Sequence, residues 1–186
     1  AHLNPAMTLA FLLEGRISGS HAVWYVISQC LGAIAGATVV LGWGALGAPL
    51  AFGATTPRAG LPLVWAVALE ALCTVVLVTT VFVFLGSPRL RAFTAWTMGP
   101  MYAVMVSLEA PWTGTSTNPA RTLGPAVATG TWSGFWVYLA GPASGALIGV
   151  ALARGLGRGE RGIAQARLVR HPADPGTSDH PAAAQP

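Results

Sequence analysis

The tripeptide Asn-Pro-Ala occurs twice in the chain, and each copy is followed one residue later by Thr-Leu. Asn is a favoured cap for a helix N-terminus, and Pro suits the first helical position because its missing N–H costs nothing there. Each tripeptide therefore predicts the start of a helix, where unpaired backbone N–H groups and the positive end of the helix dipole can face a polar solute. The six residues concerned are Asn4, Pro5, Ala6, Asn118, Pro119 and Ala120.

Carboxyl groups are rare in the apolar stretches of the chain: Glu70 lies inside one of them and Glu109 at the edge of another. With 53% hydrophobic residues, 9% charged residues and a mean hydropathy of +0.59, the chain is too apolar for a soluble domain. The composition predicts a membrane protein. A carboxylate within a membrane is a candidate functional group because burying it is costly.

Four apolar stretches, 22–46, 62–85, 92–108 and 133–153, are long enough to predict membrane-spanning helices in an all-α protein. The pieces that follow the two tripeptides, 7–13 and 122–128, are too short to span. A helix that begins inside a membrane must face protein or a water-filled cavity, because its first N–H groups are unpaired. The two helix starts are therefore expected to line a pore.

All ten basic residues are Arg, and their positions predict the orientation of the spans. Alternating the spans places eight of them on one side, which the positive-inside tendency assigns to the cytoplasm. The two half-helices then enter from opposite faces, as in the inverted repeats of transport proteins. The eight are Arg16, Arg89, Arg91, Arg154, Arg158, Arg161, Arg167 and Arg170.

The stretches "AHLNPAMTLA", "TSTNPARTLGPA", "ALEALCTVVL" and "AGPASGALIG" resemble the major intrinsic proteins, the aquaporin and glycerol-facilitator family. The resemblance covers residues 1 to about 154 and implies an aquaporin-like bundle with two re-entrant half-helices. It also implies six spans in the complete protein, so we expect a fragment that carries four of them and lacks the first two. The implied function is a passive channel for water or small neutral solutes that excludes protons and ions, in a homotetramer in the cell membrane.

The resemblance also implies roles for single residues. Asn4 and Asn118 would donate side-chain hydrogen bonds to passing water, while Pro5, Ala6, Pro119 and Ala120 fix the half-helix starts. Glu70 would accept hydrogen bonds from the loop before the second half-helix, and His2 is expected to support the first loop.

The narrow filter of the family corresponds here to Arg121, Val106 and Thr115, with a fourth position in the missing part. Arg121 would donate hydrogen bonds and repel cations, and Thr115 would offer its hydroxyl or its backbone carbonyl. Val106 stands where water-selective members usually have His, and Thr122 stands where glycerol facilitators typically have Asp. Permeability to glycerol or to metalloid acids therefore remains an alternative.

Other functions find little support in the sequence. Cys30 and Cys73 lie in apolar runs, and the four His have no metal-ligand spacing, so we expect no bound metal and no cofactor. No nucleophile triad is present, so we do not expect an enzyme. The basic, Gly/Pro/Ala-rich segment 155–186 is expected to be a disordered cytoplasmic tail, and nothing indicates nucleic-acid binding. A truncated, non-conducting remnant of the family remains a second alternative.

Overall fold

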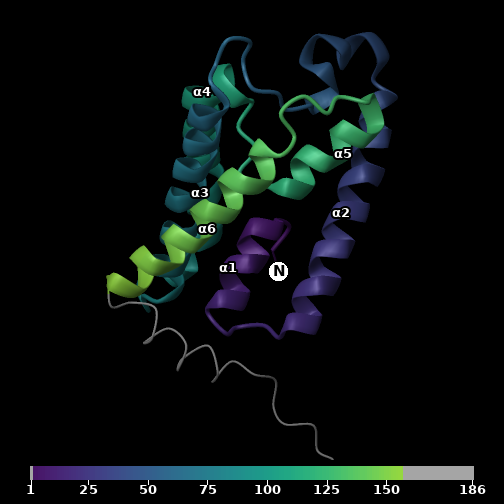
Figure 1. The fold of residues 1–186 in the computed structure, drawn as a ribbon. Helices are drawn as coiled ribbons and strands as arrows, with labels where there is room; N and C mark the ends of the chain where they lie inside the picture. Colours follow the sequence, from purple (N-terminus) through teal and green to yellow (C-terminus); the bar gives the residue numbers. More distant parts are fainter. Residues whose placement is uncertain (1, 157–186) are drawn as a thin grey trace, which may run out of the picture.

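The computed structural model describes residues 2–156, which form helices joined by short loops (Figure 1). The expected tail lies outside the described residues from position 157 on. In chain order, the elements are α1 (Pro5–Leu13), α2 (Gly19–Leu41), η1 (Gly44–Leu46), η2 (Ala48–Gly53), α3 (Leu63–Leu85), η3 (Arg91–Phe93), α4 (Thr94–Thr113), α5 (Pro119–Thr129) and α6 (Val137–Gly155).

Both predicted helix starts are present, at the N-termini of α1 and α5. The side-chain oxygen of Asn4 accepts hydrogen bonds from the backbone N–H groups of Ala6 and Met7, at 2.8 and 3.4 Å. Asn118 caps α5 in the same way, through Ala120 at 3.0 Å and Arg121 at 3.3 Å. The two short helices begin near the centre of the bundle and run toward opposite ends of it (Figure 1).

The helices α2, α3 and α6 are long and apolar enough to cross a membrane. The remaining expected span, 92–108, forms most of α4, which is 20 residues long. This helix is less apolar than the other three, because it contains Thr, Ser, Glu and two Pro residues. The prediction that the first span continues to residue 46 is wrong. The helix α2 ends at Leu41, where a Gly-rich segment begins a series of short 3-10 turns.

The helix α6 packs along α3 more extensively than any other pair of elements. Three glycines spaced four residues apart on α6 make this close approach possible. A Cβ at Gly141 would lie 2.6 Å from the Cβ of Glu70, and one at Gly145 would lie 2.5 Å from the carbonyl oxygen of Ala71. At Gly149 it would lie 2.8 Å from the Cβ of Val78. The small-residue spacing seen in the sequence is therefore a packing surface.

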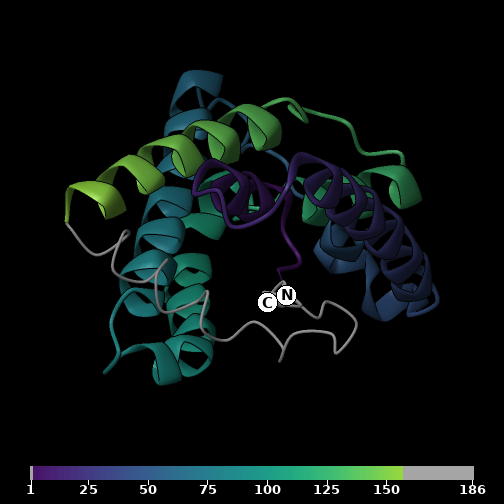
Figure 2. The same cartoon turned by 90° about the horizontal axis from the view of Figure 1, so that it is seen from below.

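The other wall of the bundle is formed by α2, which packs on α5. Seen from below, α1 lies between α2 and α6 (Figure 2). A Cβ at Gly124 of α5 would lie only 2.3 Å from the carbonyl oxygen of Ala33, so these two helices touch closely. By contrast, a Cβ at Gly32 or Gly36 would meet no atom of the described residues within 4 Å. The small-residue face of α2 is thus uncovered among residues 2–156.

One ion pair ties the C-terminal end of α1 to that of α6. The Nε atom of Arg154 lies 2.7 Å from the Oε1 atom of Glu14, and its Nη2 atom donates to the carbonyl oxygen of Leu13 at 2.6 Å. A cation at a helix C-terminus is stabilising, because it lies next to the negative end of the helix dipole. The contact places both C-termini at one end of the bundle.

Candidate channel site

The starts of the two half-helices face each other and exchange hydrogen bonds. The Nδ2 atom of Asn4 donates to the carbonyl oxygen of Thr117 at 2.8 Å. Reciprocally, the Nδ2 atom of Asn118 donates to the carbonyl oxygen of Leu3 at 3.0 Å. Each amide carries a second N–H, and the buried Asn4 side chain also contacts the hydroxyl of Tyr102. The reciprocal bonds therefore fix both side chains where the two half-helices meet.

The loop before the second half-helix is anchored on Glu70, whose side chain is fully buried in α3. Its Oε1 atom accepts the N–H of Ser116 at 2.8 Å, and its Oε2 atom accepts the N–H of Thr117 at 2.6 Å. Thr115 and Thr117 both have positive φ, at 49° and 51°. This is a costly conformation for residues other than Gly, so the loop needs such an anchor to hold it.

The loop before the first half-helix is anchored differently, on Gln29 of α2. The Nε2 atom of Gln29 lies 2.7 Å from the carbonyl oxygen of His2 and 3.0 Å from the hydroxyl of Thr8. The ring of His2 stacks on Phe11 and Tyr25, and its Nδ1 atom lies 2.8 Å from the same Thr8 hydroxyl. The His2 ring thus contacts α1 and α2, and Gln29 is a residue that the sequence analysis missed.

Arg121, in the first turn of α5, donates from Nη1 to the carbonyl oxygen of Gly53 at 2.9 Å. Gly53 and the two residues before it, Ala51 and Phe52, all have positive φ, which turns this part of the segment between α2 and α3 toward the guanidinium. Within residues 2–156 the ion pair of Arg154 is the only one, so the guanidinium of Arg121 forms no ion pair there.

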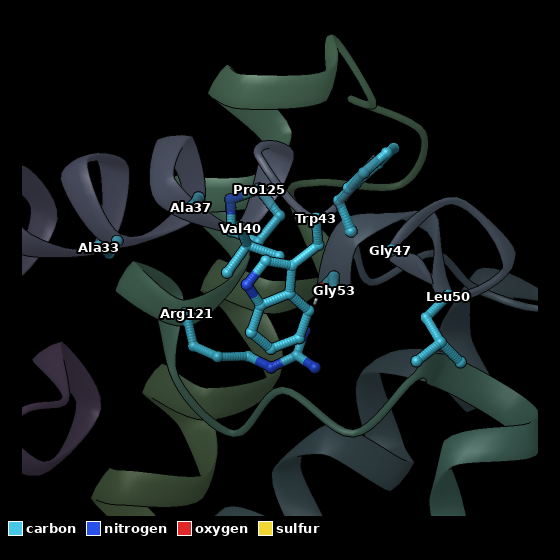
Figure 3. A pocket seen from close by; sticks show the side chains of 11 residues that line it. Ala33, Ala37, Val40, Trp43, Gly47, Leu50, Gly53, Arg121 and Pro125 are labelled. Atoms are coloured by element: carbon cyan, nitrogen blue, oxygen red, sulfur yellow. Dashed lines mark hydrogen bonds between the residues drawn. The ribbon is translucent and has the colours of Figure 1, made fainter. Parts of the chain in front are cut away.

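Arg121 lies in a hollow of about 420 Å³ between α2, the 3-10 turns and α5. Figure 3 shows its side chain extending below the indole ring of Trp43 toward Gly53. The remaining wall consists mainly of small and apolar side chains, including Ala33, Ala37 and Val40. The guanidinium is therefore the charged group of an otherwise apolar hollow.

The other two expected filter residues differ in exposure. Val106 lies on α4 with 44% of its surface exposed, and it is not among the residues that line the hollow around Arg121. Thr115 is only 3% exposed, and its hydroxyl is buried without a partner among the described residues. The hydroxyl of Thr115 is therefore not exposed to a solute.

Thr122, the residue at the position of the facilitators' Asp, is buried beneath the second loop. Its hydroxyl donates to Ser116 Oγ at 2.6 Å and lies 2.7 Å from the hydroxyl of Thr55. Ser116 in turn contacts the backbone of Asn118, through its hydroxyl and the Asn118 carbonyl oxygen at 2.8 Å. Thr122 therefore links the segment between α2 and α3 to the cap of α5.

The family model described as Major intrinsic protein matches residues 1–153. Aquaporin-4 of Mus musculus is 36% identical over 153 residues, which are 81% of this chain and 47% of that protein. Aquaporin A of Dictyostelium discoideum is 37% identical over 160 residues, or 82% of this chain and 56% of that protein. The chain thus spans about half the length of the curated relatives it matches.

Among solved structures, the aquaglyceroporin from Plasmodium falciparum superimposes with a TM-score of 0.71 at 21% sequence identity. The match covers 82% of this chain and 71% of the other. At this identity the likeness concerns the fold, and it agrees with the predicted bundle with two half-helices.

Proposed function

Because this chain belongs to the major intrinsic protein family, we propose that it forms part of a passive transmembrane channel for water and small neutral solutes. Membership in this family implies a channel rather than an enzyme. The observation that carries the proposal is the reciprocal contact of Asn4 and Asn118. It brings two amide donors and two helix N-termini to one point of the bundle.

This arrangement accounts for the expected selectivity. Donors and positive helix ends attract the oxygen of a water molecule, so neighbouring waters are oriented in opposite directions and a continuous proton-conducting chain is interrupted. The unpaired charge of Arg121 repels cations at the entrance to the same path. Val106 supplies a wall without hydrogen-bonding groups, which supports glycerol or metalloid acids as a second class of solute.

The uncovered glycine face of α2 supports a protein with further spans. Gly141, Gly145 and Gly149 of α6 are covered by α3, whereas Gly32 and Gly36 of α2 have no neighbour among residues 2–156. In an inverted repeat, a helix equivalent to α3 would cover them. By the same resemblance, we propose a homotetramer in the cell membrane, with the C-terminal segment on the cytoplasmic side.

The test is the rate of osmotic shrinking of liposomes that contain the full-length protein, compared with liposomes that contain the 186-residue chain and with empty ones. The proposal expects faster shrinking with the full-length protein and no increase in ion leakage. Rates equal to those of empty liposomes for both proteins would instead support the non-conducting remnant.

A further inference from the structure

A second hollow, of about 340 Å³, lies between α2 and α6. These two helices do not pack along each other within residues 2–156, and the half-helices α1 and α5 contact both of them. The first residues of the half-helices, Pro5 and Pro119, both line the second hollow. This hollow therefore reaches the point where the half-helices meet, and it shares no lining residue with the hollow around Arg121.

The side chains around the second hollow are apolar. The residues that line it include Leu9 of α1, Leu123 of α5 and Leu139 of α6. The thiol of Cys30 on α2 is its most polar side-chain group, and among the described residues that line it no side chain carries a charge, an amide or a hydroxyl. A water molecule in a cavity needs several polar partners, whereas apolar cavities stay dry and take up apolar molecules. The second hollow is therefore suited to hydrocarbon.

The second hollow opens on the outside of the bundle. Leu139 is 44% exposed, and Val26 and Cys30, which line the hollow on α2, are half-buried. These two residues of α2 lie about 120° around the helix from Gly32 and Gly36, because successive residues of a helix are about 100° apart. A further span that packs on the two glycines therefore covers a different face of α2 from the one that borders the hollow.

We propose that an acyl chain of a membrane lipid occupies the second hollow. The two helices that border it, α2 and α6, are long and apolar enough to cross a membrane. Cys30 is the middle residue of α2, and the half-helices begin near the centre of the bundle (Figure 1), so the hollow lies at the depth of the lipid tails. Lipid tails are as apolar as the Leu side chains that line it. This lipid contact, which reaches Pro5 and Pro119, goes beyond the proposed channel activity and requires only that the protein lies in a bilayer.

The experiment is photocrosslinking in liposomes that contain the full-length protein and a phosphatidylcholine with a diazirine near the end of one acyl chain. Mass spectrometry then locates the labelled residues. Label is expected at Cys30 with this probe, and it should be absent there when the diazirine is placed in the headgroup. No label with the acyl probe would mean that protein, from this chain or from a second copy, covers the hollow, and equal label with both probes would mean that no acyl chain enters it. Either result overturns the proposal.

A substitution that fills the second hollow tests the site itself. Ala143 of α6 lines the hollow, so Ala143→Trp should place an indole ring there and abolish the label at Cys30. The matched control is Ala151→Trp, because Ala151 is exposed on the same helix, about 12 Å further along its axis, and does not line the hollow. The control should keep the label, and equal label in the two variants contradicts the proposal. If Ala143→Trp does not insert, the two probes on the wild type still decide. The label is read without any flux, so the result is independent of the channel proposal.

Discussion

Replacing Glu70 with Gln is expected to loosen the loop that positions the second half-helix. Glu70 accepts the N–H of Ser116 on one oxygen and that of Thr117 on the other, at 2.8 and 2.6 Å. Whichever way the Gln amide is oriented, its NH2 group faces one of these backbone N–H groups. Two buried donors then lack acceptors, and each costs about 1–3 kcal/mol. The free energy of unfolding should therefore fall by about 2–6 kcal/mol.

The assay for this loss is unfolding in detergent followed by Trp fluorescence, with Glu14→Gln as the matched control. Glu14 accepts from the Nε atom of Arg154, and Gln keeps an oxygen that can accept the same hydrogen bond, so the control should cost less than Glu70→Gln. Glu70→Gln should also slow osmotic shrinking of liposomes, because the cap of α5 follows the anchored loop. The reasoning is refuted if Glu70→Gln unfolds no earlier than Glu14→Gln.

Three further predictions concern the solute path of the full-length protein. Arg121→Ala should raise cation leakage and leave water flux largely intact, because the path loses its unpaired charge; an unchanged leak would mean that Arg121 does not face the path. Asn118→Asp should lower water flux or admit cations, because a carboxylate replaces the amide donor that lies 3.0 Å from the Leu3 carbonyl oxygen; an inserted variant with wild-type flux and selectivity would count against the site. Val106→His should suppress glycerol flux and spare water, measured as vesicle swelling in glycerol and in a non-permeant osmolyte, and equal glycerol flux in both proteins would remove Val106 from the filter.

The helix starts could be predicted from the sequence because their signal is local. Asn followed by Pro specifies a cap and a first turn whatever the rest of the chain does, and both α1 and α5 begin where the tripeptides predict. The end of α2 could not be predicted, because the apolar run continues past Leu41 while the backbone turns at the following glycines. Hydropathy alone does not distinguish an apolar turn from a helix.

The contacts that hold the site depend on residues far apart in the sequence. Gln29 is the only amide side chain in the run 22–46, and this isolated polar residue could have marked it as a candidate. The sequence does not indicate that its partner is the first loop. The bond from Arg121 to Gly53 depends on positive φ at Ala51 and Phe52, residue types that rarely adopt it. Glu109 stood out as a carboxyl at the edge of a span, yet its link to Glu70, through the hydroxyl of Thr113, appears only in the fold.

The central claim is that solutes pass where the two half-helices meet and that protons do not. Paired recordings on the same liposomes test it most directly: the rate of osmotic shrinking and the decay of an imposed proton gradient, both followed as the amount of full-length protein is increased. The account predicts that the shrinking rate rises in proportion to the protein while the decay of the gradient stays at the rate of empty liposomes. A gradient that decays in proportion to the protein would contradict it.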